Sequence, residues 1–338
     1  MHQLGIIGCG WVAPFHVQAL NQLSDRAQVK WVADPDPQRA DHVARQIKSD
    51  SDVDILTDYR DGLDRVDCVS VLVPHHLHHP ITIDALDANC HVLLEKPFAM
   101  NLTEADDMIA KADAVNRVLM VAYPHRYRKS TQRFKQLIDS GAYGKLFMLD
   151  AMMDEDLRAY VSGWMTTKAT LGGGVFFSAS PHMLDVMLWI GGRVHSISMV
   201  GTRAGLNMEG EDTALAIIKF TSGVVGSTRH TWFSPKPQTW YMMTAFCEKA
   251  KLTLTVSPSG DLAKEGHRCL WKSRIDVSGA TDDVLLDTDE GLDFTQEVTH
   301  FFDCIDHQIP CQIDGRSVRE LMVVLFDAIR KAEADGSL

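Results

Sequence analysis

A glycine-rich stretch near the start of the chain has residue types and spacing that suit binding of a phosphate group. Residues 8–13 read Gly-Cys-Gly-Trp-Val-Ala, which fits the pattern G-x-G-x-x-G/A with alanine in the last place. Gly8 permits a tight turn, and Gly10 lets the backbone approach a pyrophosphate without a Cβ atom in the way. Trp11 and Val12 lead into a helix whose first N–H groups and positive dipole end attract phosphates. We therefore predict that Gly8, Gly10, Trp11 and Val12 bind the pyrophosphate of a dinucleotide.

An acidic residue follows this turn at the distance that a ribose-binding carboxylate requires. Asp34 ends the second apolar run, 24 residues after Gly10, near the spacing of about 20 residues in dinucleotide-binding folds. A carboxylate accepts hydrogen bonds from a free ribose 2′-hydroxyl and repels a 2′-phosphate, so Asp34 favours NAD as the cofactor. Arg39 is close enough in sequence to weaken that repulsion, which leaves NADP as the less favoured alternative.

The elements that must position these residues alternate between strands and helices. We expect strands at residues 4–7, 29–33, 68–73, 91–94 and 118–123, and helices at residues 12–23, 37–48, 79–89 and 102–116. The run at 68–73 (CVSVLV) is apolar throughout, which is typical of a strand covered on both faces. This rhythm predicts an α/β fold with a doubly wound parallel Rossmann sheet, a dinucleotide-binding domain at residues 1–123.

Beyond residue 123 the alternation stops and strands cluster. A helix at 130–140 precedes a strand near 146–152, and a further helix follows the three glycines at 172–174 and runs to about residue 190. Candidate strands lie at 195–201, 213–220, 224–232, 239–246 and 252–256, and amphipathic helices at 294–306 and 318–334 close the chain. We expect a second, α+β domain at residues 124–338 with an open, mostly antiparallel sheet.

Composition excludes several classes of protein. The 338 residues carry a formal net charge of −12 and no basic stripe, which argues against a dedicated nucleic-acid binder. No run of 18 apolar residues predicts a transmembrane helix, and no signal peptide is recognisable at the N-terminus. The seven cysteines are odd in number and form no C-x-x-C pair, so we expect neither a disulfide framework nor a structural zinc site. A reducing, cytoplasmic location fits best.

Four further motifs extend along the chain and are more specific than the glycine turn. They are Val73-Pro74-His75-His76-Leu77-His78, Glu95-Lys96-Pro97, the sequence YPHRY at 123–127, and the stretch from Gly172-Gly173-Gly174 to Asp185, which includes His182. With these motifs the chain resembles the glucose-fructose oxidoreductase/inositol dehydrogenase (Gfo/Idh/MocA) family.

The resemblance implies an NAD(P)-dependent enzyme that acts on sugars, cyclitols or related compounds. It implies that the second domain binds the substrate and that its sheet forms the interface of a homodimer or homotetramer. Lys96 and His182 would border the nicotinamide and the substrate hydroxyls, which makes both the candidate catalytic residues. On the cofactor side, the matching positions are Pro74, His75, His78, Glu95, Lys96 and Arg126.

The chain departs from the family pattern where an acid usually stands four residues before the histidine. Ser178 occupies that position, and Ser180 replaces a glycine. If residues 174–190 form one helix, then Ser178, His182 and Asp185 share a face, and Asp185 can fix the tautomer of His182 or solvate it. Pro181 must kink such a helix or mark an irregular turn.

Oxidation of a secondary alcohol requires a group that accepts a proton. Lys96 follows the strand expected at 91–94, at the carboxyl end of the sheet where ligands bind, and a nearby nicotinium with partial desolvation would make its amine a usable base. The alternative for Lys96 is a lysine on a surface loop. His182 needs little tuning to exchange protons near neutral pH, although a lone helical histidine is often structural.

Other residues admit two interpretations each. Tyr160 and Trp164 can line a sugar pocket or pack in the core, and His230 and Trp232 can face a pocket or the interior of the sheet. The histidines at 75, 76, 78 and 79 suggest a metal, but cofactor-loop and capping roles fit them better, so we predict no metal.

Three functions stay open at this point. The first is an NAD-dependent sugar or cyclitol dehydrogenase that uses Lys96 and His182. The second is an enzyme that keeps NAD bound and recycles it during an elimination, epimerisation or bond cleavage. The third is a regulatory protein that binds NAD and a sugar without catalysis, which the serine at 178 favours and the retained lysine and histidine oppose.

Overall fold

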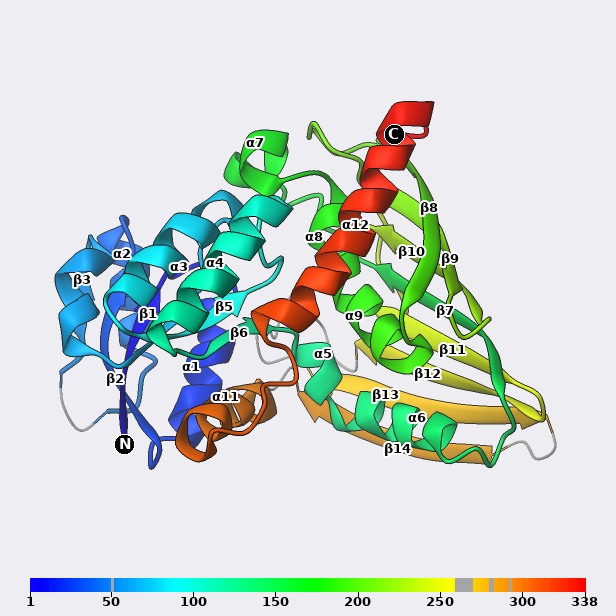
Figure 1. Ribbon diagram of the computed structural model, residues 1–338, viewed down its shortest axis with the longest axis horizontal. Helices are drawn as coiled ribbons and strands as arrows, with labels where there is room; N and C mark the ends of the chain where they lie inside the picture. Colours follow the sequence, from blue (N-terminus) through cyan, green and yellow to red (C-terminus); the bar gives the residue numbers. More distant parts are fainter. Residues whose placement is uncertain (50–51, 259–269, 280–282, 292–293) are drawn as a thin grey trace. The chain divides into compact units, whose positions relative to one another are not determined.

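The computed structural model describes residues 1–338 except for 50–51, 259–269, 280–282 and 292–293 (Figure 1). The chain forms two compact units, Met1–Pro124 with Asp293–Glu320 and His125–Leu292 with Leu321–Leu338. The segment 293–320, which the sequence placed in the second domain, thus belongs to the first unit. Among the described residues, no helix has the length and apolar character needed to cross a membrane.

The first unit is built on a parallel six-stranded sheet in the order β3-β2-β1-β4-β5-β6. The strands are β1 (His2–Ile7), β2 (Ala27–Ala33), β3 (Asp54–Leu56), β4 (Cys68–Val71), β5 (His91–Glu95) and β6 (Leu119–Ala122). Every residue of β4 and β6 is buried, as their apolar sequences require. The predicted doubly wound sheet is therefore confirmed, although the three-residue β3 was not predicted. The order reverses between β1 and β4, and ligands bind at the carboxyl ends of strands beside such a switch point.

Helices connect these strands and cover the sheet (Figure 1). They are α1 (Ala13–Gln22), α2 (Pro37–Ala44), α3 (His78–Asp87) and α4 (Leu102–Val115), with short 3₁₀ turns η1 (Tyr59–Arg65) and η2 (His75–Leu77). Two of these helices start with a side-chain N-cap. Asp36 accepts a hydrogen bond from Gln38 N at the start of α2, and Asn101 accepts one from Glu104 N at the start of α4.

The segment 293–320 completes the first unit. Helix α11 (Thr295–His307) packs against α1, where the rings of Phe15 and Phe294 stack with centroids 5.6 Å apart. The chain then passes along the edge strand β6, and Val121 N donates to Ile313 O at 3.1 Å. This pairing covers one exposed edge of the sheet. Helix α12 (Gly315–Asp335) begins in this unit and ends in the second.

The second unit contains an eight-stranded sheet in the order β14-β13-β12-β11-β7-β10-β9-β8. The strands are β7 (Leu146–Asp154), β8 (Val194–Thr202), β9 (Thr213–Phe220), β10 (Val225–Thr231), β11 (Tyr241–Cys247), β12 (Ala250–Pro258), β13 (Leu270–Gly279) and β14 (Asp283–Gly291). Neighbouring strands are antiparallel except β7 and β10, which are parallel. The expected mostly antiparallel sheet is confirmed, and β13 and β14 extend it beyond the predicted strands.

Helices cover one face of this second sheet. Those that contact its strands are α6 (Lys129–Asp139), α8 (Val175–Ser178) and α9 (Ser180–Gly191). The same unit also contains α5 (Pro124–Tyr127), η3 (Gly163–Thr166), α7 (Lys168–Leu171) and the later part of α12. Helix α9 contacts β7 and β10, and α6 contacts β12 and β13 (Figure 1). Buried and exposed residues alternate along β9, so its other face is open to solvent.

Candidate active site

The turn between β1 and α1 requires glycine at its first position. Gly8 has a φ of 95°, and a Cβ atom on it would lie 2.4 Å from the carbonyl oxygen of Leu72. Its amide donates to Ala33 O at 2.8 Å, which ties the turn to the neighbouring strand β2. The backbone can therefore make this bend only with glycine at position 8.

The next glycine serves a different purpose, because space surrounds it. A Cβ atom on Gly10 would meet nothing within 4 Å. Among the described residues, the structure shows no hydrogen-bond partner for the amides of Gly10 and Val12, and α1 begins directly afterwards at Ala13. Open space beside amides at a helix N-terminus suits a phosphate group. Trp11 between them has an exposed side chain.

Asp34 lies at the end of β2 and holds the same turn. Its Oδ2 accepts from Cys9 N at 2.9 Å, and its Oδ1 accepts from Asp36 N at 2.9 Å. Each carboxylate oxygen keeps a further lone pair for a ribose hydroxyl. Burial, and then the charge of Asp34, raises the pKa of the Cys9 thiol to about 12, so this cysteine is no nucleophile at neutral pH.

His78 connects two turns at the carboxyl ends of β4 and β5. The ring is fully buried, with Nδ1 2.8 Å from Pro97 O and Nε2 3.0 Å from Val73 O. Burial lowers its pKa to about 4, so the neutral ring donates to one of these carbonyls at a time. We predicted contact with the cofactor for His78, but both ring nitrogens face the backbone, and the structure places it as a tether. His75, one turn earlier, is also buried, and Pro74 begins that turn.

Glu95 and Lys96 are anchored by a residue that the sequence analysis did not single out. Glu95 Oε2 accepts from Lys96 N at 3.1 Å, and Oε1 lies 3.1 Å from Nε2 of His16. His16 is fully buried on the inner face of α1. Glu95 therefore links α1 to the backbone of Lys96. Its side chain faces inward, whereas that of Lys96 is half-buried. The sequence did offer a signal for His16, because it lies on the inward, otherwise apolar side of its helix.

In the second unit, Arg126 and Asp185 form a buried, two-pronged ion pair. Arg126 Nε donates to Asp185 Oδ2 at 2.9 Å, and Nη2 donates to Oδ1. Burial raises the pKa of Asp185, and the adjacent guanidinium opposes that shift. The carboxylate thus pairs with Arg126, and the structure shows no hydrogen bond from it to His182 among the described residues. The expected role of Asp185 in fixing that histidine is not supported.

The helix expected at residues 174–190 is divided into α8 and α9. The break falls at Ala179, and Pro181 lies in the first turn of α9, where proline is tolerated. The predicted irregular turn is confirmed as this break beside Pro181. Ser178 ends α8 and is buried, whereas His182 lies in the first turn of α9 and is half-buried.

The ring of His182 packs against that of a second histidine. Its ring meets that of His125 edge-on, with centroids 4.7 Å apart. His125 is itself buried against Trp240 and Tyr241, at 5.1 and 5.0 Å. The indole of Trp240 donates to Glu155 Oε1 at 3.3 Å. His125 stands in the YPHRY motif beside Arg126, so the sequence offered a signal for it. Trp240 and Glu155 lie far apart in sequence and offered none.

The remaining candidates differ in exposure. Tyr160 is exposed and Trp164, in η3, is half-buried, so both are accessible. Trp232 is buried, and so is His230, whose pKa burial lowers to about 3; both belong to the interior of the second unit.

The candidate residues are thus divided between the two units. The first unit carries Gly8, Gly10, Trp11, Val12, Asp34, Pro74, His75, His78, Glu95 and Lys96, and the second carries Arg126, Tyr160, Trp164, Ser178 and His182. Among the described residues, the one group of three potential metal ligands lies elsewhere, at His300, Cys304 and Cys311. Its spacing matches no common zinc motif, so the sequence analysis missed it.

Two family models match the chain. The model for the oxidoreductase family with an NAD-binding Rossmann fold (GFO_IDH_MocA) matches residues 2–123, and the model for the GFO/IDH/MocA C-terminal domain matches residues 131–253. The glycine turn, Asp34 and Glu95-Lys96 all lie within the first match.

Individual relatives agree with these matches. The chain is 31% identical over 241 residues to 1-carboxy-3-chloro-3,4-dihydroxycyclohexa-1,5-diene dehydrogenase of Comamonas testosteroni, covering 69% of this chain and 58% of the relative. It is 30% identical over 207 residues to D-glucoside 3-dehydrogenase of Escherichia coli (strain K12), covering 56% of this chain and 58% of the relative. The matched part therefore spans somewhat more than half the length of these relatives.

Solved structures share the fold at lower identity. Levoglucosan dehydrogenase in complex with NADH and levoglucosan has a TM-score of 0.82 at 19% identity, covering 98% of this chain and 97% of that chain. The WlbA dehydrogenase of Bordetella pertussis, in complex with NADH and UDP-GlcNAcA, has a TM-score of 0.79 at 20% identity, covering 98% and 96%.

Proposed function

Because the chain belongs to the Gfo/Idh/MocA family of oxidoreductases, we propose that it transfers hydride between NAD(H) and a secondary hydroxyl/carbonyl pair of a sugar, cyclitol or related polyol. One observation carries the proposal. Within the first unit, a phosphate-binding turn, a ribose-binding carboxylate and a lysine on an anchored loop all follow the carboxyl ends of parallel strands. The relatives named for dehydrogenation of glucosides and levoglucosan support the same class of substrate.

The residues present fit a dinucleotide. The space beside Gly10 is the volume that a Cβ atom would fill, and the amides of Gly10 and Val12 can donate to the pyrophosphate. The amides of Cys9 and Asp36 hold the Asp34 carboxylate in place, so the lone pairs that remain free have fixed directions. We therefore propose that Asp34 accepts from the adenosine ribose hydroxyls and disfavours the 2′-phosphate of NADP.

Lys96 is the proposed proton-transfer residue. A bound nicotinamide supplies the hydride donor or acceptor, and the protein must move the proton. Glu95 holds the backbone of Lys96 through its amide, and His16 fixes the other oxygen of that carboxylate. The loop can then present the lysine Nζ in one position. In the oxidative direction, that Nζ accepts the substrate hydroxyl proton as neutral amine; in the reductive direction it donates as ammonium.

His182 is the second proposed catalytic residue. Its half-buried ring is held edge-on by His125, and Ser178 supplies a neutral hydroxyl where the family pattern has an acid. A serine cannot exchange a proton at neutral pH, so we assign acid–base chemistry to Lys96 and His182. The accessible Tyr160 and Trp164 are proposed to contact the sugar.

The open face of the second sheet is proposed as the interface of a homodimer or homotetramer. It exposes large apolar side chains on neighbouring strands, among them Phe147 of β7, Ile217 of β9 and Val225 of β10. The side chain of Ile217 is 68% exposed, and contiguous apolar surface of this kind marks interaction sites. Ile217→Asp should convert the oligomer to monomers by light scattering; an unchanged mass would reject this interface. The described cysteines form no disulfide, which fits the proposed cytoplasmic location.

Substitution of Lys96 tests the proposed activity. Wild-type protein should generate NADH absorbance with NAD and a panel of sugars and cyclitols. Lys96→Met should lower kcat by about 10²–10⁴-fold, the contribution expected of a general base. Its affinity for NAD by calorimetry should stay within a few-fold, because the phosphate and ribose contacts remain.

The matched control is Lys48→Met, since Lys48 is an exposed lysine of the same unit. It should leave both activity and affinity unchanged. Wild-type turnover in Lys96→Met would remove Lys96 from the mechanism, and failure of the wild-type protein to bind any dinucleotide would reject the proposed function as a whole.

A further inference from the structure

Two thiols and an imidazole meet in a part of the first unit that supplies none of the proposed cofactor-binding residues. His300 and Cys304 lie one turn apart on α11, and Cys311 lies in the segment that follows. One potential ligand atom from each residue lies within 4.8 Å of the other two. His300 and Cys304 are buried and Cys311 is half-buried. The three side chains therefore converge without a change in the backbone.

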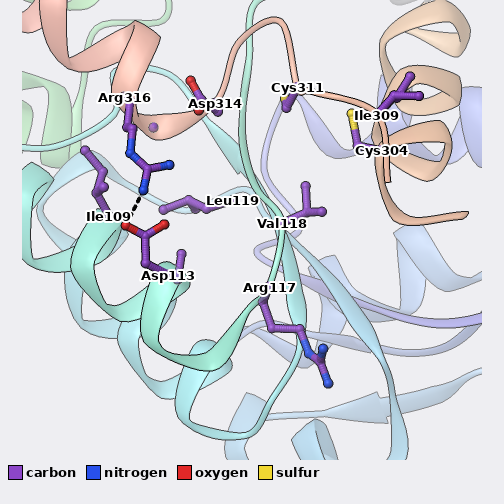
Figure 2. A pocket seen from close by; sticks show the side chains of 12 residues that line it. Ile109, Asp113, Arg117, Val118, Leu119, Cys304, Ile309, Cys311, Asp314 and Arg316 are labelled. Carbon is purple, nitrogen blue, oxygen red and sulfur yellow. Dashed lines mark hydrogen bonds and ion pairs between the residues drawn. The ribbon is translucent and has the colours of Figure 1, made fainter. Parts of the chain in front are cut away.

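Two of these residues also line a cavity. A cavity of about 160 Å³ is bounded by Cys304 and Cys311, by the aliphatic side chains of Leu119 and Ile309, and by Asp314. Figure 2 shows both cysteines at one end of the cavity and the ion pair of Arg316 with Asp113 at the other. A ligand held by the cysteines would thus have one side open to a space large enough for water molecules.

The distance between two of the potential ligand atoms matches that in a tetrahedral zinc site. Zinc binds sulfur at about 2.3 Å and nitrogen at about 2.0–2.1 Å, which sets neighbouring sulfur and nitrogen ligands about 3.5 Å apart. Cys304 Sγ lies 3.4 Å from His300 Nε2. Two cysteines and a histidine form a donor set that selects thiophilic ions such as Zn²⁺ over hard ions such as Mg²⁺.

We propose that His300, Cys304 and Cys311 bind a zinc ion through three protein ligands. The fourth position faces the cavity and takes a water molecule. Among the described residues, Asp314 does not belong to the group whose ligand atoms lie within 4.8 Å of one another, so it is not assigned as the fourth ligand.

Zinc binding would replace one hydrogen bond with bonds between the metal and its ligands. Gln312 N donates to His300 Nε2 at 3.1 Å, and the metal takes the lone pair that accepts this bond. Both thiols must also lose their protons, so uptake of zinc releases protons and weakens at low pH. In return the ion joins α11 to the segment that pairs Ile313 with the edge strand β6. The site would therefore stabilise the covering of that edge.

Cobalt provides a spectroscopic test on the full chain. Protein purified under reducing, metal-free conditions is titrated with Co²⁺, which gives a thiolate-to-cobalt charge-transfer band, and then with Zn²⁺. We expect one Co²⁺ per chain with this band and its displacement by Zn²⁺. Cys304→Ser and Cys311→Ser should each weaken binding by more than the about 10–100-fold that loss of an outer-sphere partner causes.

Cys90→Ser is the matched control, since Cys90 is a buried thiol of the same unit outside the cluster. It should bind as the wild type does. X-ray absorption of the zinc-loaded wild-type protein needs no variant and should show two sulfur ligands at about 2.3 Å. A zinc shell of nitrogen and oxygen alone would overturn the proposal, as would unchanged cobalt binding in either cysteine variant. So would absence of the band in reduced protein.

Discussion

The ion pair of Arg126 and Asp185 allows a sharp test of what the arginine does. The Asp185 side chain is 5% exposed and that of Arg126 13%, and the guanidinium also lies over the ring of Trp189, 5.4 Å from its centroid. Asp185→Asn preserves the shape of the side chain but removes its charge and one acceptor oxygen. The arginine then stays positively charged in a nearly buried place with one prong of the fork unsatisfied.

The cost follows from this burial. Removal of one partner from a buried pair costs about 3–5 kcal/mol of the free energy of unfolding, because the other charge is left uncompensated. The partial exposure of Arg126 places the expected value near the lower end, about 3 kcal/mol. For a domain of this size each kcal/mol shifts Tm by about 2–4 °C, so we expect a loss of about 6–12 °C.

Thermal and urea unfolding of Asp185→Asn, Arg126→Met and the double variant would measure the pair. We expect the double variant to be no less stable than Asp185→Asn alone, since it carries no unpaired charge. Asp156→Asn is the matched control, because Asp156 pairs with Arg158 at side-chain exposures of 28% and 47%. That more exposed pair should contribute no more than about 1 kcal/mol.

The same variants separate a structural role from a cofactor role. The family resemblance placed Arg126 among the cofactor-binding residues, whereas the structure engages its guanidinium with Asp185. If the ion-pair reasoning holds, Arg126→Met loses stability while calorimetry shows little change in affinity for NAD. Undiminished stability together with an NAD affinity at least about 10-fold weaker, about 1.4 kcal/mol, would refute it.

Three further predictions concern single residues of the two units. Gly10→Ala should fold normally and lose affinity for NAD in calorimetry, because its Cβ atom fills only the proposed phosphate space. Gly8→Ala should instead lose about 1–3 kcal/mol or more of the free energy of unfolding in urea, because position 8 has a φ of 95°. An unchanged NAD affinity in Gly10→Ala would contradict the phosphate site. Asp34→Asn should reduce the preference for NAD over NADP in steady-state kinetics, since it removes the charge that repels a 2′-phosphate, and a wild-type preference for NADP would count against Asp34. Burial lowers the pKa of His230 from 6.5 to about 3, so the folded chain takes up this proton less readily than the unfolded chain. The stability present above pH 6.5 therefore falls by about 1.4 kcal/mol per pH unit between these two values. His230→Gln should reduce the pH dependence of the free energy of unfolding, measured in urea between about pH 6 and 4.5, by up to that slope, and parallel profiles would be inconsistent with a buried neutral imidazole.

The parts of the fold that the sequence predicted are those that local pattern determines. The run at β4, apolar except for Ser70, is typical of a strand covered on both faces, and the glycine turn marks the junction of β1 and α1. Two of the strands missed, β3 and β14, have no such pattern. β3 has three residues, and β14 (DVLLDTDEG) is acidic, so its placement depends on pairing with β13 rather than on its own hydrophobicity.

Contacts between distant segments could not be predicted at all. Pairing of Ile313 with β6 brings the segment 293–320 back to the first unit, although its sequence follows that of the second. The partner of Arg126 lies 59 residues away. The break at Ala179 was different, because Pro181 indicated it in the sequence.

Burial separates residues that sequence chemistry had grouped together. His78, Glu95 and Lys96 were all candidates for cofactor binding, and Lys96 also for catalysis, yet each has different surroundings in the structure. His78 is enclosed and ties two loops, Glu95 fixes a backbone amide, and Lys96 keeps its side chain half-buried. A group that touches a cofactor or substrate must be reachable, so the first two position the third. Variants of His78 and Glu95 should therefore act through the geometry of the lysine loop.

The serine at 178 can be understood in the same terms. Position 178 is buried at the end of α8, where an ionised carboxylate would lose its hydration unless a cation compensated it. A neutral hydroxyl avoids an uncompensated buried charge at this position. Because the acid is absent, we propose that proton exchange rests with Lys96 and His182, whose half-buried side chains carry groups that can gain and lose a proton.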